Sequence, residues 1–334
     1  MPVIEHSTHR PSRLFNSGHW QTIWPALWPP PAAPPPEPER IPTEDGDFLD
    51  LDWRRSGNRR VAVISHGLEG SSRAGYVRGM AAALLHAGWD VLAWSFRGCG
   101  RDPNLLPILY HSGKTDDLRQ VIARAARDYS GLGLVGFSLG GNLTLKYLGE
   151  APDAVEPGIA AAVTFSVPCD LEAAARRLAQ PSNRLYNQRF LRSLRGKVRE
   201  KARQFPERID TRDLRRVRTF RAFDDRYTAP LHGFRDAVDY WKQCGSRQFL
   251  PAIHVPTLLV NARNDPFLAP ECFPFREAED NPAFYLETPP GGGHVGFASF
   301  PPRGPRWSER RAVEFLNTVK PDLKCERGEA SGQE

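Results

Sequence analysis

The 334-residue sequence lacks several features that mark whole classes of protein. No apolar run approaches the roughly 18 residues that a membrane-spanning helix needs. The first residues carry neither a basic stretch nor an apolar core, so we expect no signal peptide. The five cysteines are scattered, odd in number and never spaced as C-x-x-C, which argues against a disulfide framework and a zinc site. We therefore expect a reduced, cytoplasmic protein without a metal.

Positive charge is in excess, but it is concentrated in one segment. The formal net charge is +6, and residues 176–221 contain 16 Arg or Lys against four acidic residues. This basic segment could be a solvated helical face, a surface that attracts anionic lipid or acyl substrates, or a nucleic-acid site. No RNP-like motif, zinc finger or KH loop accompanies it, so we expect no nucleic-acid partner. A solvated face is the simplest interpretation, and peripheral contact with anionic lipid is the alternative.

Short apolar runs alternate with segments of helical periodicity over most of the chain. This alternation predicts an α/β fold, with a mostly parallel central sheet covered by helices on both faces. An antiparallel hairpin over residues 40–53 precedes it. The other predicted strands are 60–65, 89–96, 133–135, 159–165, 257–261 and 283–287, and the predicted helices are 76–87, 116–127, 142–148 and 308–319.

The length fits one large α/β domain with an insertion, since such domains run to about 250 residues. Residues 1–40 are expected to form an irregular leader, rich in Trp and Pro, that packs on the body. Residues 41–320 are expected to form the domain. The strand–helix alternation stops at about residues 171–250, which we expect to form a helical cap that shapes the pocket. Residues 321–334 are polar and expected to be a flexible tail.

The sequence G-F-S-L-G at residues 136–140 lies between a predicted strand and a predicted helix. That context is the one a nucleophile elbow requires, and the two glycines give the strand and helix room to pass. Ser138 is then the candidate nucleophile, and the backbone amide of Leu139 a candidate oxyanion donor. The loop after strand 60–65 offers a second donor, the amide of Leu68. An incidental serine in a Gly-rich turn is the alternative.

Two further candidates follow predicted strands directly. Asp265 comes after strand 257–261 and His294 after strand 283–287, so all three candidates lie where sites form in such sheets. Their chain order is Ser, Asp, His, as in this fold class. The imidazole of His294 can take the proton of Ser138, and the carboxylate of Asp265 can orient the imidazole.

Other residues compete for these roles, namely Asp224, Asp225, His66 and His254. His254 precedes a strand, which puts it at the wrong end of the sheet, and His66 is better explained as structural. His111 and Asp116 form an H-x-x-x-x-D pattern found in some acyltransferases. Asp116 lies at a helix start, where an acid is commonly found without any catalytic role.

Motifs along nearly the whole chain carry a family resemblance: FNSGHWQT (15–22), HGLEGS (66–71), FRGC (96–99), YHSG (110–113), GFSLGGN (136–142), FDD with TAP (223–230), NDPF (264–267) and GGHVGF (292–297). With them the sequence resembles the YheT-like branch of the α/β-hydrolases, a family of predicted esterases and lipases. The resemblance implies Ser138, Asp265 and His294 as the triad. Eukaryotic relatives often carry an N-terminal membrane anchor, whereas this chain has only its leader, so we expect no stable anchor.

Together these features predict a serine hydrolase that acts through an acyl-enzyme. Its substrates would be small-molecule carboxylic esters, with short- to medium-chain acyl groups or lipid-like structures, and no cofactor is implied. Some relatives transfer acyl groups to alcohols, so an acyltransferase using the same triad is the alternative. A non-catalytic ligand-binding member of the fold is a third hypothesis, and the oligomeric state stays open.

Overall fold

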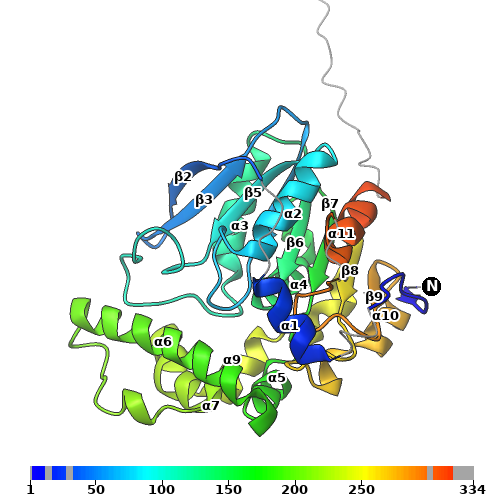
Figure 1. The fold of residues 1–334 in the computed structure, drawn as a ribbon. Helices are drawn as coiled ribbons and strands as arrows, with labels where there is room; N and C mark the ends of the chain where they lie inside the picture. Colours follow the sequence, from blue (N-terminus) through cyan, green and yellow to red (C-terminus); the bar gives the residue numbers. More distant parts are fainter. Residues whose placement is uncertain (1, 12–16, 28–32, 299–303, 319–334) are drawn as a thin grey trace, which may run out of the picture.

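The computed structural model describes residues 2–11, 17–27, 33–298 and 304–318. Within these ranges the chain forms one nine-stranded sheet in the order β1-β9-β8-β7-β6-β4-β5-β3-β2 (Figure 1). All neighbouring strands from β1 to β5 in this order are parallel, and β3 and β2 join as an antiparallel hairpin. The strands are β1 (Val3–Ile4), β2 (Glu37–Pro42), β3 (Phe48–Arg54), β4 (Arg60–Ser65), β5 (Asp90–Ser95), β6 (Gly131–Phe137), β7 (Ile159–Phe165), β8 (Thr257–Val260) and β9 (Phe284–Glu287).

Helices cover both faces of this sheet, as the sequence predicted. Helices α2 (Gly75–His86) and α11 (Trp307–Thr318) pack on one face, where their apolar side chains share a buried cluster with β4, β6 and β7. Helices α3 (Thr115–Ala126), α4 (Leu139–Glu150) and α10 (Phe275–Asp280) pack on the other face. Because both faces are covered, the central strands are almost continuously apolar rather than alternating.

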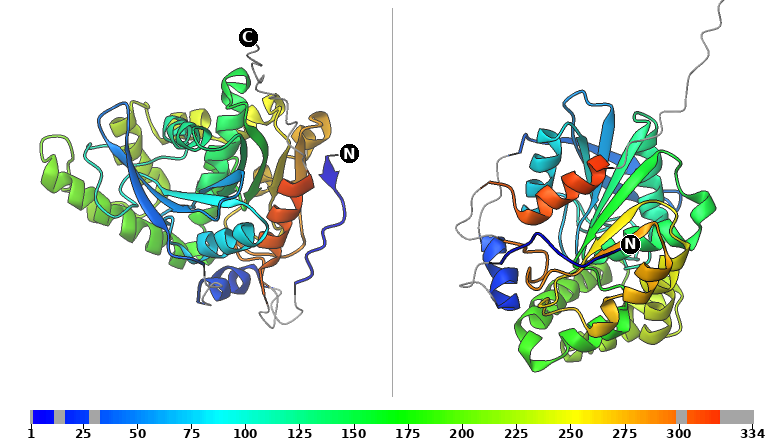
Figure 2. Two further views of the ribbon diagram at one scale, coloured as in Figure 1. Left: turned by 90° about the horizontal axis from the view of Figure 1, so that it is seen from above. Right: turned by 90° about the vertical axis from the view of Figure 1, so that its right-hand side faces the viewer.

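The chain between β7 and β8 is helical. It forms α5 (Leu171–Leu178), α6 (Arg184–Gln204), α7 (Phe220–Phe223), α8 (Ala229–His232) and α9 (Ala237–Cys244), joined by short 3-10 and π turns. These helices lie together on one side of the sheet (Figures 1 and 2). Part of the segment has its own buried cluster, in which Leu191, Leu194 and Val198 of α6 pack against Phe223 and Tyr227. An insertion with its own core can therefore cover the strand ends without extending the sheet.

The leader differs from the irregular segment that we expected. Its strand β1 pairs with β9 and completes one edge of the sheet, and its helix α1 (Gly18–Leu27) packs on the loops after β8 and β9. Trp20 and Trp24 of the Trp-rich leader thus belong to a helix. Residues 12–16 and 28–32 of the leader, and the whole expected tail at 321–334, fall outside the described residues.

Candidate active site

Ser138 lies at the turn between β6 and α4 with a positive φ of 52° and a ψ of −117°. This conformation is strained for a residue with a side chain and persists only where the surroundings enforce it. The strand and the helix pass very closely: a Cβ on Gly136 would lie 2.6 Å from the Cα of Gly141. A Cβ on Gly140 would lie 2.4 Å from the backbone oxygen of His66. Glycine is therefore required on both sides of Ser138 to bring β6, α4 and the end of β4 together.

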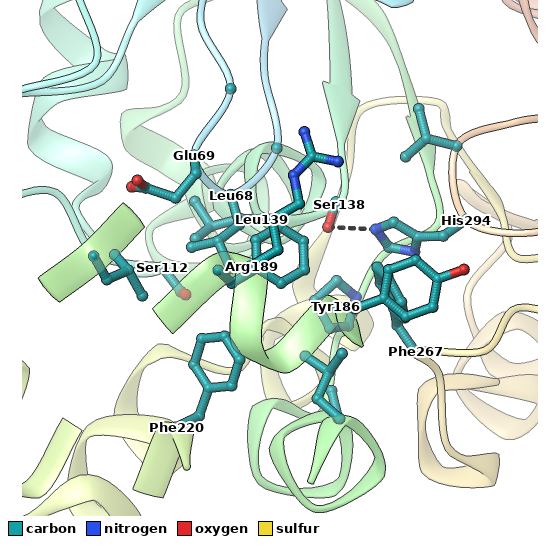
Figure 3. A pocket seen from close by; sticks show the side chains of 18 of the residues that line it. Leu68, Glu69, Ser112, Ser138, Leu139, Tyr186, Arg189, Phe220, Phe267 and His294 are labelled. Atoms are coloured by element: carbon teal, nitrogen blue, oxygen red, sulfur yellow. Dashed lines mark hydrogen bonds between the residues drawn. The ribbon is translucent and has the colours of Figure 1, made fainter. Parts of the chain in front are cut away.

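The side chains of Ser138, His294 and Asp265 form one hydrogen-bonded chain. Nε2 of His294 lies 2.9 Å from Oγ of Ser138 (Figure 3), and Nδ1 lies 2.9 Å from Oδ2 of Asp265. The ionised carboxylate only accepts hydrogen bonds, so it holds the imidazole proton on Nδ1 and leaves the Nε2 lone pair facing Ser138. The backbone N–H of Phe267 donates to the other oxygen of Asp265, and the carboxylate is fully buried. We refer to these three side chains as the Ser–His–Asp chain.

Helix α1 holds the loop that carries His294, a contribution that the sequence analysis missed. The backbone N–H of His294 donates to Oγ1 of Thr22 at 2.9 Å, and the N–H of Gly292 donates to Oε1 of Gln21. A Cβ on Gly296 would lie 1.8 Å from the backbone oxygen of Gln21, so the loop and the helix touch through their backbones. The signal in the sequence was the FNSGHWQT motif, which includes Gln21 and Thr22. It contributed to the family resemblance, but its residues were given no function.

His66 is structural in its contacts. It is fully buried, and burial lowers its pKa to about 3, so the ring is neutral. Its Nε2 accepts from the backbone N–H of Phe96 at 3.0 Å, and Nδ1 donates to the carbonyl of Gly67 at 2.7 Å. The hydroxyl of Tyr76 accepts from the N–H of Gly67 at 2.8 Å. These bonds fix the loop that follows β4.

The two predicted oxyanion donors, the amides of Leu68 and Leu139, come from two different segments beside Ser138. Leu68 lies in the loop after β4, Leu139 is the first residue of α4, and both line the same cavity as Ser138 (Figure 3). A Cβ on Gly67 would lie 3.2 Å from the Cβ of Ser138, so the loop runs directly beside the serine. The first amides of α4 lie at a helix N-terminus, where negative charge is favoured.

The competing acids and histidine are placed elsewhere. Asp224 is buried in the cavity wall, and burial raises its pKa to about 7. It accepts hydrogen bonds from Thr228 and Trp241 and has none with a histidine among the described residues. Asp225 accepts from a backbone N–H of α9, and His254 is exposed before β8. The residues that the structure describes hold no group of three or more His, Cys, Asp or Glu placed to bind a metal ion.

The H-x-x-x-x-D pattern is not assembled into a pair. His111 lies in the wall of the cavity, whereas Asp116 is exposed in the first turn of α3 and forms an ion pair with Lys114 at 3.3 Å. No hydrogen bond joins the two side chains in the described part of the chain. The pattern is therefore explained by a helix start.

A cavity of about 720 Å³ opens beside Ser138. Its wall comes from α1, from the loop after β4 and from the helical insertion. A volume of this order is typical of small-molecule sites, and here the lining is mainly apolar. The apolar lining residues include Ile23, Leu27, Leu68, Leu171, Leu178, Phe190, Phe220, Phe223, Leu231 and Phe267.

A mostly parallel, helix-covered sheet with Ser, His and Asp meeting at its strand ends is typical of the α/β-hydrolases. The chain belongs to this family, whose model, described as the alpha/beta hydrolase fold, matches residues 62–301.

Curated relatives agree with the resemblance seen in the sequence. The chain is 33% identical over 324 residues to "Putative esterase YheT" of Escherichia coli, and the match covers 94% of each protein. It is 29% identical over 294 residues to phospholipase ABHD3 of Mus musculus, covering 84% of this chain and 71% of that protein. Among solved structures, an esterase of Pyrococcus furiosus, Pf2001, shares the fold with a TM-score of 0.57 at 19% identity, covering 85% of this chain and 91% of that one. The predicted fold class and family are thus confirmed.

Proposed function

We propose that this protein is a serine esterase that hydrolyses carboxylic esters with short- to medium-chain or lipid-like acyl groups. The observation that carries the proposal is the Ser–His–Asp chain in the wall of an apolar cavity. The names of the relatives, an esterase and a phospholipase, support the reaction class.

In the first half-reaction Oγ of Ser138 attacks the ester carbonyl carbon while Nε2 of His294 takes the hydroxyl proton. The resulting oxyanion accepts hydrogen bonds from the amides of Leu139 and Leu68. Asp265 stabilises the imidazolium, which then protonates the leaving alcohol oxygen as the C–O bond breaks. An acyl group is left on Ser138.

In the second half-reaction water replaces the alcohol. His294 removes a proton from the water as the water oxygen attacks the acyl carbon, and the bond between that carbon and Oγ of Ser138 then breaks while the imidazolium returns the proton to Oγ. The products are a carboxylic acid and a free enzyme. An alcohol that enters in place of water would give acyl transfer by the same steps.

The experiment is to measure hydrolysis of p-nitrophenyl esters over a series of acyl lengths. We expect Ser138→Ala to abolish turnover and covalent labelling by a fluorophosphonate, with an unchanged thermal unfolding midpoint. Ser182→Ala, at an exposed serine before α6, is the matched control and should behave as wild type. Turnover by folded Ser138→Ala would overturn the assignment. Adding ethanol and measuring the ratio of ethyl ester to free acid separates transfer from hydrolysis.

A further inference from the structure

Helix α1, which lines part of the cavity, exposes large apolar side chains. Trp20, Ile23 and Leu27 lie on one face of the helix, and Trp20 and Leu27 are 57% and 73% exposed. The opposite face is anchored through Gln21 and Pro25, which are buried. Ile23 and Leu27 also line the cavity, so the exposed face continues into the site. A soluble surface gains nothing from three adjacent exposed apolar side chains, and such patches mark binding surfaces.

Helix α6 carries an exposed stripe of arginines. Residues 185, 189, 192, 199 and 203 fall within an arc of about 80° when successive residues turn by 100°. They are Leu185, which is 79% exposed, followed by Arg189, Arg192, Arg199 and Arg203, all exposed. We call these four arginines the α6 stripe. At about 1.5 Å per residue it extends for roughly 21 Å.

The α6 stripe has no carboxylate partner within the described ranges. On the inner side of the same helix, by contrast, Lys197 forms an ion pair with Glu69 at 2.9 Å, and Lys201 donates to the carbonyl of Asn104. Glu200 is the only acidic residue of α6. The inward-facing lysines thus have partners within the protein, whereas the outward-facing arginines are available to an external anion.

The apolar face and the stripe are parts of one surface. His19 of α1 stacks on Tyr186 of α6 with ring centroids 5.7 Å apart, and its Nδ1 lies 3.3 Å from the tyrosine hydroxyl. Arg189 lines the same cavity as Ile23 and Leu27 (Figure 3). Figures 1 and 2 place α1 and the N-terminal end of α6 next to each other. The wall of the cavity therefore includes apolar side chains of α1 and the first arginine of the α6 stripe.

We propose that α1 and the α6 stripe form one docking surface for a bilayer that contains anionic phospholipid, so that the cavity mouth faces the lipid. Guanidinium groups pair with phosphate, and Trp and aliphatic side chains insert at the interface between headgroups and acyl chains. A polyanion such as nucleic acid would use the stripe but not the apolar face. None of the helices in the described part of the chain could itself cross a membrane. The proposed contact is peripheral.

The test is co-sedimentation with vesicles of phosphatidylcholine alone or mixed in equal parts with phosphatidylglycerol. It uses the full chain with Ser138→Ala, so that the lipid stays intact and the result does not depend on the proposed reaction. We expect binding to the mixed vesicles that weakens with added salt, and much weaker binding to phosphatidylcholine. Failure to sediment with either vesicle, or tighter binding to heparin than to mixed vesicles, would overturn the proposal.

Two variant pairs locate the surface. Arg192→Glu with Arg199→Glu should lower the partition coefficient onto mixed vesicles by about tenfold or more. Arg59→Glu with Arg127→Glu makes the same change in net charge at exposed positions before β4 and β6, and should lower it less than about twofold. Trp20→Ser should weaken binding, whereas Phe275→Ser, at an exposed residue of α10, should not. The assigned surface would be contradicted if either control variant lost as much vesicle binding as the variant with which it is compared.

Discussion

Ser138 and His294 meet at one hydrogen bond, but the chain holds them in different ways. The turn that carries Ser138 is held by backbone packing, because two glycines let α4, β6 and the end of β4 approach to contact distance. The loop that carries His294 is held from outside, by Gln21 and Thr22 of a helix that lies more than 250 residues earlier in the chain. A local turn can be read from a few consecutive residues, whereas a loop held by a remote helix cannot.

The Ser138 turn and the His294 loop should therefore also respond differently to substitutions. Close backbone contacts around Ser138 cannot yield without moving strands of the sheet, and protein interiors are packed too densely to absorb such shifts. The loop that carries His294 also touches the backbone of α1, but its hydrogen bonds are donated to the side chains of Gln21 and Thr22, and a substitution can remove these bonds singly. We therefore expect damage at the turn to lower stability and activity together, and damage at the α1 contact to lower activity alone.

The largest expected effect lies where the two regions meet. In the proposed mechanism Ser138 and His294 act as one unit, so His294→Ala should lower kcat by about 10⁵-fold or more, and the double variant with Ser138→Ala should be no worse. Asp265→Asn should lower kcat by about 10⁴-fold, because the imidazole loses its fixed tautomer. Steady-state kinetics on one p-nitrophenyl ester checks all three. If the two single losses multiplied in the double variant, the residues would act independently.

The second effect tests the packed turn. Gly140→Ala places a Cβ against the backbone oxygens of Ser65 and His66, at 2.5 and 2.4 Å, where nothing flexible can move aside. We expect the free energy of unfolding to fall by about 1–3 kcal/mol, as for other overpacked sites, and activity to fall with it. Urea unfolding and ester hydrolysis measure the two losses.

Gly196→Ala is the matched control for this prediction. A Cβ at Gly196 meets open space on the surface of α6, so the variant should gain roughly 0.5–1 kcal/mol from helix propensity and keep its activity. If Gly140→Ala were as stable and as active as wild type, the Ser138 turn would be less tightly packed than its distances indicate.

The third effect tests the α1 contact. Thr22→Val keeps the shape of the side chain but removes the oxygen that accepts the N–H of His294. Without this bond the loop can displace His294 from Ser138, and because misplacement by about 1 Å can cost about 100-fold, we expect kcat to fall at least about tenfold. The loss of one hydrogen bond should lower the free energy of unfolding by only about 1 kcal/mol. Thr22→Ser, which keeps the hydroxyl, should restore most of the rate. A Ser variant as slow as the Val variant would indicate a packing role instead.

The same contrast explains what the sequence could and could not predict. Strand–helix alternation and the G-x-S-x-G turn depend on neighbouring residues, so the parallel sheet, its two helical layers and the position of Ser138 could be inferred directly. Asp265 and His294 could be proposed because each follows a strand of that sheet. The role of Gln21 and Thr22 could not, since no local pattern states that a leader expected to be irregular forms a helix against the loop after β9.

The smallest expected effect concerns His66 and the pH dependence of the packed turn. Burial lowers the pKa of His66 from 6.5 to about 3, so the unfolded chain binds a proton there that the folded protein excludes. Its contribution to stability is complete above pH 6.5 and is lost as the pH falls from there toward 3. From pH 8 to pH 6 the loss is about 1 kcal/mol.

His66→Asn removes this titration along with the contacts to Phe96 and Gly67. The variant should therefore be less stable than wild type at pH 8, and the gap should narrow by about that amount at pH 6. Other buried histidines titrate equally in both proteins, so urea unfolding of the pair at the two pH values isolates His66. If the difference in stability between wild type and His66→Asn were the same at both pH values, His66 would be protonated as readily in the folded protein as in the unfolded chain. The loop after β4, against which the Ser138 turn packs, would then be more open to water than its close contacts indicate.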